Sequence, residues 1–116
     1  MVNKRQMGTA YEDRACDFLR EQGLVILERN YRKRIGEIDI IARDGDCLTF
    51  IEVKYRSGSD RGGAAYAIPR SKQLKIARVA QWYLAEKHVP ADTFCRFDAV
   101  LIDAEEIRYE KNAWRM

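Results

Sequence analysis

The stretch GEIDIIARDGDCLTFIEVK, residues 36–54, decides the fold of this chain. Two apolar runs within it flank the turn-forming sequence Asp44-Gly45-Asp46. Because Asp-Gly between two apolar runs is a strong hairpin signal, the stretch predicts two paired strands. The first strand is expected from Gly36 to Arg43 and the second from Leu48 to Arg56.

Acidic side chains interrupt both apolar runs, and strand geometry predicts where they point. Side chains alternate between the two faces of a strand, so Glu52 and Lys54 share a face, with Cα atoms about 6.6 Å apart. On the first strand the same rule separates Asp39 from Ile38 and Ile40, which are expected to share the opposite face. A register that sets Asp39 beside Glu52 would bring two carboxylates together near an ammonium.

Such a pair of carboxylates is suited to holding a metal ion. Each carboxylate raises the pKa of the other by repulsion, and a hard dication relieves that repulsion. Oxygen ligands suit Mg²⁺ or Mn²⁺, so the expected ligands are Asp39, Glu52 and the carbonyl oxygen of Val53, with waters. The ion would activate a water and neutralise a phosphate, while Lys54 would orient that water and stabilise the phosphorane. These residues predict phosphodiester hydrolysis; the alternative is a cross-strand ion pair on a solvated face.

The flanking sequence predicts the remaining elements. An apolar stripe of period 3.6 predicts a helix over residues 5–22, which Gly23 ends. Residues 24–27 predict a strand, residues 69–88 a second helix, residues 94–102 a strand and residues 107–109 a short last strand. The glycine- and serine-rich residues 57–67 predict a loop beside the acids. The order α-β-β-β-α-β-(β) predicts one α/β domain over residues 1–116, with a mixed central sheet flanked by the two helices.

Basic residues are concentrated in two segments, although the net charge is only +3. Segregated charge of this kind favours a polyanionic partner, with general solubility as the alternative reading. The residues expected to contact nucleic acid are Arg29, Arg32, Lys33, Arg34, Arg56 and Lys72. DNA is the expected partner.

Composition excludes several other classes of protein. Apolar residues make up 47% of the chain and charged residues 34%, which is normal for a globular domain. No apolar stretch is long enough for a membrane span or a signal peptide, so a cytoplasmic protein without a membrane partner is expected. The three cysteines and the one histidine are far apart, which does not predict a disulfide framework or a zinc site.

The hairpin and its flanks resemble a known group of nucleases. The segments GEIDIIARDG and LTFIEVKYR look like the core of the PD-(D/E)xK, restriction-endonuclease-like superfamily. The segments GTAYEDRA, RNYR, KQLKIARVAQWYL and RFDAV extend the likeness over nearly the whole chain. The full pattern resembles the bacterial YraN-like family of predicted endonucleases, which are similar to Holliday-junction resolvases. Ile38 stands where the name of the superfamily would place proline.

The resemblance implies roles for individual residues. Asp39 and Glu52 match metal ligands and Lys54 matches the catalytic lysine. Glu12 matches a glutamate of the first helix that completes many resolvase-like sites, and Gln73 a polar residue on the helix that follows the lysine. For Glu12 the alternative is a capping box that starts at Thr9. For Gln73 the alternative is a solvated position on the helix.

Together these patterns predict a Mg²⁺- or Mn²⁺-dependent DNA endonuclease, with branched or junction DNA as the candidate substrate. A non-catalytic nucleic-acid-binding module and an accessory subunit remain alternatives. Symmetric cutting of a junction would need a homodimer. Asp98 is expected to be structural, pairing with Arg96 or a helix end. The aromatic residues Trp82, Tyr83 and Trp114 are expected in the core or an interface rather than as base-stacking platforms.

Overall fold

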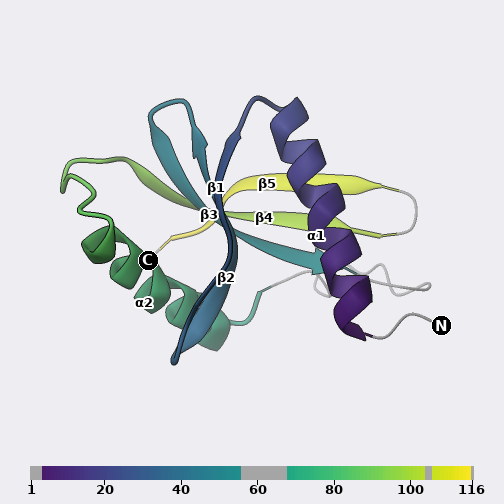
Figure 1. Cartoon of the computed structure of the whole chain (residues 1–116), viewed down its shortest axis with the longest axis horizontal. Helices are drawn as coiled ribbons and strands as arrows, with labels where there is room; N and C mark the ends of the chain where they lie inside the picture. The colour runs from purple at the N-terminus through teal and green to yellow at the C-terminus, as the bar shows by residue number, and fades with distance from the viewer. Residues whose placement is uncertain (1–3, 56–67, 104–105, 116) are drawn as a thin grey trace.

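Five strands form one mixed sheet in the order β1-β2-β3-β4-β5 (Figure 1). The strands are β1 (Val25–Lys33), β2 (Gly36–Asp44), β3 (Cys47–Tyr55), β4 (Cys95–Ile102) and β5 (Ile107–Trp114). Neighbouring strands are antiparallel except β3 and β4, which are parallel. The computed structural model describes residues 4–55, 68–103 and 106–115, with the backbone alone for residues 4–7.

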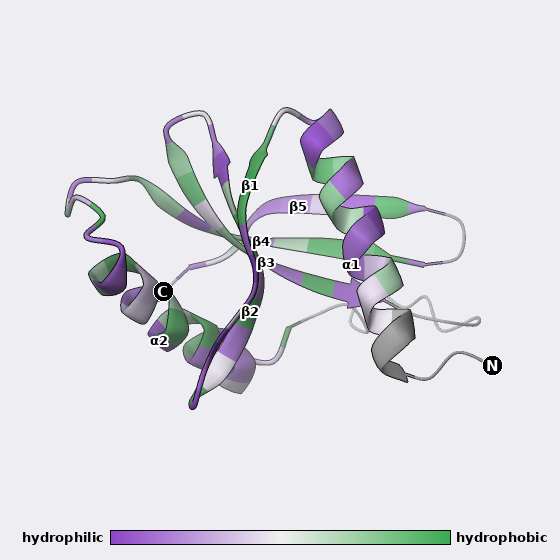
Figure 2. Cartoon of the chain, in the orientation of Figure 1, coloured by the Kyte–Doolittle hydropathy of each residue, from purple (hydrophilic) through white to green (hydrophobic). Residues whose placement is uncertain are grey.

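The two helices cover opposite faces of this sheet (Figure 1). Helix α1 spans Lys4–Glu21 and helix α2 spans Arg70–Glu86, within the connection between the parallel strands β3 and β4. Both helices alternate between hydrophilic and hydrophobic residues along their length (Figure 2). Because each apolar stripe must leave water, each helix packs against one face of the sheet.

Two separate hydrophobic clusters hold these layers together. The α2-side core contains Ile38, Ile41, Leu48, Phe50, Ile68, Ile76, Val79, Ala80, Tyr83, Ala99, Leu101 and Trp114. The α1-side core contains Ala15, Cys16, Leu19, Leu24, Ile40, Ala42, Ile51, Val100 and Ile102. Fully burying one leucine or isoleucine side chain contributes about 1.5–3 kcal/mol, so these clusters are the main stabilising contacts between helices and sheet.

The predicted fold class is confirmed. The mixed sheet, the flanking helices and the order α-β-β-β-α-β-β all agree with the expectation. Two strands are longer than predicted, since β1 continues through the basic segment to Lys33 and β5 runs to Trp114. The predicted loop over residues 57–67 lies outside the described residues.

Backbone geometry explains two predicted boundaries. Helix α1 ends at a Schellman motif, in which Leu24 donates its N–H to the Leu19 carbonyl and Gly23 donates to Arg20. Gly23 has a φ of +94°, a backbone conformation that residues other than glycine adopt only with steric strain. In the hairpin, Gly45 has a φ of +61° and lies in the turn that joins β2 to β3.

The predicted alternation along β2 is wrong at Ile38. Ile38 belongs to the α2-side core, whereas Ile40 belongs to the α1-side core. The partner strand changes face at the same level, because Arg29 contacts helix α1 and Tyr31 contacts helix α2. Between them Asn30 has a φ of +53°, a conformation that asparagine tolerates better than most residues. Both strands therefore rotate at this level, and Asp39 lies at the point of rotation.

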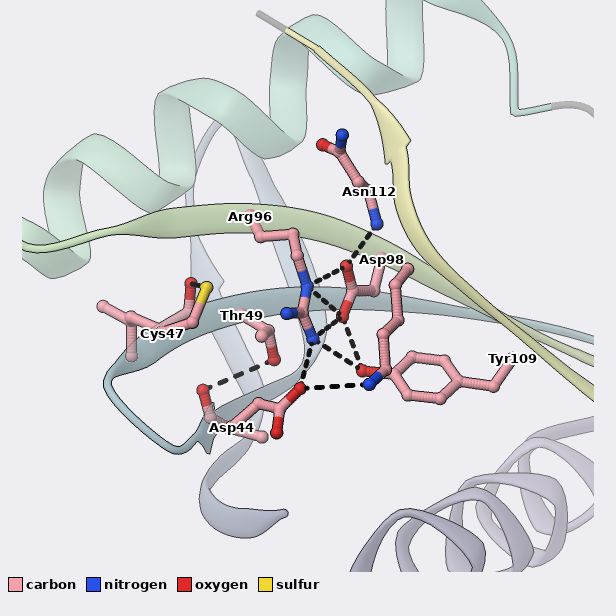
Figure 3. A network of polar contacts seen from close by, with 10 residues as sticks. Asp44, Cys47, Thr49, Arg96, Asp98, Tyr109 and Asn112 are labelled. Atoms are coloured by element: carbon pink, nitrogen blue, oxygen red, sulfur yellow. Dashed lines mark hydrogen bonds and ion pairs between the residues drawn. The ribbon is translucent and has the colours of Figure 1, made fainter. Parts of the chain in front are cut away.

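The end of the sheet next to the β2–β3 turn is held by a buried ion pair (Figure 3). Asp98 is fully buried and accepts hydrogen bonds from Arg96 at 2.9 Å, from the Tyr109 hydroxyl at 2.6 Å and from the Asn112 amide at 2.8 Å. Arg96 also donates to Asp44 at 2.8 Å. These contacts join β4 to a register shift of β5 and to the end of β2. The expected structural pairing of Asp98 with Arg96 is thus confirmed.

Candidate metal centre

A cavity of about 240 Å³ lies between the hairpin and the start of helix α2. Strands β2 and β3 contribute Asp39 and Glu52 to its lining. The remaining lining residues are Gly36, Glu37, Ser71, Lys72, Lys75 and Ile76. The cavity therefore combines two acids from neighbouring strands with basic residues from the first two turns of a helix.

The two carboxyl groups of Asp39 and Glu52 meet in this cavity. They are hydrogen-bonded to one another, and Asp39 Oδ2 also accepts the Val53 amide N–H at 2.8 Å. The β2–β3 register continues to Ile40 opposite Ile51, so the next residue on each strand carries an acid. Glu52 is only 4% exposed, which excludes the alternative of a cross-strand pair on a solvated face.

Burial has a strong effect on the protonation of this pair. It raises the pKa of Asp39 well above the usual range, and the charge of Glu52 and the hydrogen bond to it raise it further. The Val53 N–H acts in the opposite direction, since it stabilises the ionised form. Without a bound cation, these effects favour the protonated form of Asp39.

Lys72 lies against Glu52 rather than facing only outward. Its ammonium forms an ion pair with Glu52 Oε2, although the Lys72 side chain is otherwise half-exposed. Burial lowers the pKa of Lys72, but the hydrogen bond and the charge of Glu52 more than offset this and leave it raised. Lys72 therefore supplies a cation within the chain at the position where the acids meet.

The predicted catalytic lysine, Lys54, follows Glu52 by two residues on β3. Strand alternation places both side chains on the α2 side, and Lys54 is half-buried. Val53 turns to the other side, where its side chain packs against the α1-side core. The roles of Lys54 and of the Val53 carbonyl stay predictions.

Glu12 approaches the pair from helix α1. The helix begins at Lys4, so Glu12 lies in its middle and the alternative capping box at Thr9 is wrong. Burial raises the pKa of Glu12, whose Oε1 atom is buried without a hydrogen-bond partner. Its negative charge also contributes to the raised pKa of Asp39. Glu12 thus contributes a third acid to the electrostatics of this region.

Gln73 is held away from the cavity. Its side-chain amide donates to the Ile68 carbonyl at 2.9 Å and its Oε1 accepts from Arg70 at 3.2 Å. Both contacts stabilise the start of helix α2, where backbone groups lack helical partners. Neither brings Gln73 to the acids.

Three of the predicted DNA-contacting residues on β1 have acidic partners within the chain. Arg29 binds Asp13 at 2.7 Å, Arg32 binds Glu37 at 2.9 Å and Lys33 binds Glu86 at 2.9 Å. Arg34 is exposed at the turn into β2 and has no recorded ion pair within the described ranges. Arg56 lies outside the described residues. A phosphate approaching β1 would compete with these acids for three of the cations.

Comparison with known proteins identifies the family. The model of a family described as "Uncharacterised protein family UPF0102" matches residues 11–102, which include both acids and Glu12. The chain belongs to family UPF0102. A UPF0102 protein of Lachnoclostridium phytofermentans is 47% identical over 113 residues, covering 97% of this chain and 96% of the relative. One of Dechloromonas aromatica is 49% identical over 107 residues (92% and 87%), and one of Vibrio cholerae 40% over 115 residues (97% and 94%).

The donor atoms of this UPF0102 protein fit a hard dication. Asp39 and Glu52 offer neighbouring carboxylate oxygens in a buried cavity, and the ammonium of Lys72 shows that the site already accommodates positive charge. Across residues 4–55, 68–103 and 106–115, no three His, Cys, Asp or Glu side chains converge as a ligand set. An ion would therefore depend on two carboxylates and waters, as is usual for Mg²⁺. In the same ranges no helix has the length and apolarity that crossing a membrane requires.

Sequence reasoning missed two features of this site. It predicted that Lys72 contacts phosphate and did not predict that Lys72 lines the cavity of the two acids. Lys72 and Lys75 are one helical turn apart, and both line this cavity. It also missed the change of strand face at Asn30. An asparagine within a strand is a signal for this, because asparagine adopts a positive φ more readily than most residues.

Replacing Asp39 with asparagine is expected to stabilise the metal-free protein. Because burial holds a proton on Asp39, the folded state binds more protons than the unfolded state above the unfolded pKa, and stability falls as pH rises. The Asp39→Asn variant removes this penalty and still accepts the Val53 N–H. We expect its free energy of unfolding at pH 8 to exceed that of the wild type by at least about 1 kcal/mol.

Urea denaturation in EDTA at pH 8 and at pH 5 measures this effect. The advantage of Asp39→Asn should shrink at pH 5, where the wild-type carboxyl loses less by remaining protonated. Asp92→Asn, at an exposed position before β4 and without a recorded ion pair among the described residues, serves as the matched control. A variant that is less stable than the wild type at pH 8 would contradict the assignment of a buried, protonated Asp39.

Proposed function

We propose that this UPF0102 protein is a metal-dependent DNA endonuclease of the PD-(D/E)xK type. The observation that carries the proposal is the meeting of Asp39 and the buried Glu52 in a cavity beside basic residues. Two carboxylates in contact repel one another, and a bound dication would relieve that repulsion further than the single ammonium of Lys72 does. The likeness of the hairpin sequence to the superfamily core supports the same reading.

The protein groups divide the work of hydrolysis between them. Asp39 and Glu52 would hold Mg²⁺ or Mn²⁺. When bound, this ion neutralises negative charge on the phosphate and lowers the pKa of a coordinated water. Lys54, on the face of β3 that carries Glu52, would orient the attacking water and stabilise charge developing on the phosphate. The DNA backbone would lie along the basic side of the cavity, toward Lys75 and Arg34. The hydrolysis would leave a 5′-phosphate.

Cleavage assays with defined DNA substrates test this proposal. Purified protein would be incubated with labelled single-stranded, flapped, four-way branched and blunt duplex DNA, in Mg²⁺, in Mn²⁺ and in EDTA. We expect metal-dependent cutting of at least one substrate, with products that a ligase can rejoin because they carry 5′-phosphates. Salt-sensitive DNA binding without cutting in any metal would instead support the alternative of a non-catalytic binding module.

Lys72 is expected to compete with the metal ion for Glu52. An ammonium paired with Glu52 must be displaced, or must tolerate a neighbouring dication, when the ion binds. The Lys72→Met variant removes that competition while keeping the length of the side chain. We expect Mn²⁺ affinity, measured by titration calorimetry without DNA, to rise about 10-fold, which corresponds to about 1.4 kcal/mol.

Lys75→Met is the matched control for this measurement. Lys75 lines the same cavity but has no recorded ion pair with Glu52 among the described residues, so its loss should change Mn²⁺ affinity less. Weaker Mn²⁺ binding by Lys72→Met would show that the ammonium supports the site rather than competing for it. DNA affinity in EDTA should fall for both variants, because each loses a cation.

A further inference from the structure

Helix α2 exposes a tryptophan that the hydrophobic core does not use. Trp82 is 56% exposed, whereas its neighbour Tyr83 is buried. Of the two positions expected for Trp82, the core or an interface, the structure excludes the core, whereas Tyr83 and Trp114 are buried. An exposed indole leaves a large apolar surface in contact with water, and aromatic side chains of this kind are frequent at binding surfaces.

The ring lies at an open hollow of about 500 Å³ on the outer side of helix α2. Arg78 and Gln81 line the hollow from the preceding turn of the helix, and Ala85 from the following one. Ile35, at the turn between β1 and β2, closes the other side. The hollow thus combines one flat aromatic surface with a hydrogen-bonding amide and a guanidinium.

Two basic side chains, Lys33 and Arg78, lie near the ring. The Lys33 Nζ lies 5.8 Å from the centre of the Trp82 ring, where a cation–π contact is favourable. Arg34 and Arg78 are exposed, and neither has a recorded ion pair in the described part of the chain. The acid in contact with this group is Glu86, which is already bonded to both Lys33 and Tyr31. The hollow therefore favours an anionic partner.

The hollow and the candidate metal centre are separate, but their linings include neighbouring residues. Gly36 and Lys75 line the cavity, and the hollow is lined by Ile35, the residue before Gly36, and by Arg78, one turn after Lys75. Ten residues of helix separate Lys72 from Trp82, a rise of about 15 Å. A phosphate chain that leaves the cavity along helix α2 would reach the indole within a few nucleotides.

We propose that Trp82 is a stacking platform for an unpaired base of the nucleic acid whose backbone passes the candidate metal centre. Stacking on an exposed indole needs a free base face, which a continuous duplex hides. The inference rests on the proposed function, because it assumes that the nucleic-acid backbone runs from the metal centre along helix α2. It narrows the substrate class to DNA with unpaired bases. Single strands, flaps and open branches belong to this class.

Charge argues against a second copy of the chain as the occupant. A two-fold contact sets the same patch against itself, so Arg78 and Arg34 would face the same cations of the partner. Like charges brought together in this way oppose association. A nucleic acid instead supplies phosphates for the cations and a base for the ring.

Tryptophan fluorescence tests the proposal without requiring cleavage. The chain has two tryptophans, and Trp114 is only 8% exposed. In a Trp114→Phe variant, Trp82 is the sole reporter. Titration with oligothymidylate in EDTA should quench its fluorescence, and titration with a blunt duplex of equal charge should quench it much less. Unchanged Trp82 fluorescence at saturating single strand would overturn the proposal.

Affinity measurements on single substitutions provide the second test. Trp82→Ala should weaken binding of the single strand by roughly 5- to 150-fold in EDTA, and Trp82→Phe by less than Trp82→Leu, because phenylalanine keeps an aromatic face. Affinity for blunt duplex should change less than about twofold. Phe94→Ala is the matched control, since Phe94 is 77% exposed before β4, outside the residues lining this hollow.

Other outcomes separate the competing explanations. Equal losses on duplex and single strand would overturn the stacking role and leave Trp82 a general contact. Concentration-dependent sedimentation of the wild type that Trp82→Ala abolishes would assign the hollow to self-association and overturn the proposal. Quenching and selective affinity loss in a protein that never cuts DNA would support stacking while rejecting the nuclease, so the two proposals fail separately.

Discussion

The Glu52→Gln variant is expected to cleave DNA at least about 100-fold more slowly than the wild type while keeping its fold. Glutamine has nearly the same shape and can still accept a hydrogen bond from Lys72, so the buried cavity should remain intact. It cannot provide the negative charge that the dication needs from one of its two carboxylates. Single-turnover cleavage of labelled DNA in Mn²⁺ measures the loss, and calorimetry should show weaker Mn²⁺ binding.

Glu110→Gln is the matched control for this comparison. Glu110 undergoes the same chemical change on the exposed side of β5, where it pairs with Arg108. Its cleavage rate and Mn²⁺ affinity should equal those of the wild type. Cleavage by Glu52→Gln within about threefold of the wild-type rate on every substrate would reject the assignment of the site, even if the protein is a nuclease.

The Asp98→Ala variant is expected to lose about 3–5 kcal/mol of stability. Asp98 is fully buried and accepts hydrogen bonds from three groups on two strands. Its removal leaves Arg96 with the more exposed Asp44 and leaves the Asn112 amide without its acceptor. Urea denaturation monitored by far-ultraviolet circular dichroism measures the change.

Two milder substitutions in the same network calibrate this result. Tyr109→Phe removes one hydrogen bond to Asp98 and should cost about 1 kcal/mol. Asp44→Ala removes a partner of Arg96 near the surface and should also cost about 1 kcal/mol or less. If Asp98→Ala is no less stable than Asp44→Ala, the network contributes little and the clusters alone hold the sheet. Should Asp98→Ala fail to fold, Asp98→Asn provides the same comparison with the shape preserved.

Much of the fold was predictable because the signals are local. The hairpin follows from Asp-Gly between apolar runs, and the ends of the helices follow from Gly23 and Pro69. The length of β1 was underestimated because its second half is rich in charged residues, which do not give a strand pattern. An edge strand such as β1 tolerates these charges. The same local rules predict that Glu52 and Lys54 share one face of β3.

The candidate site was only partly predictable, because side-chain contacts between distant elements leave weak signals in the sequence. The meeting of Asp39 and Glu52 agrees with the hairpin register and with regular alternation next to Ile40 and Ile51, whereas simple alternation does not contain the change of face at Ile38. The position of Glu12 depended on where helix α1 begins. The exposure of Trp82 could not be distinguished from burial, since its neighbour Tyr83 is equally aromatic.

The sequence by itself determined the element order, the hairpin and the acids of this UPF0102 chain, because hydrophobic periodicity and turn residues act over a few neighbouring positions. Only the tertiary structure decided that Lys72 lies against Glu52, that Gln73 stays at the start of helix α2 and that Trp82 faces water. Periodicity reports which residues leave water but not what they meet. The pairing of Lys72 with Glu52, which is twenty positions away in the chain, depends on how helix α2 packs on the sheet.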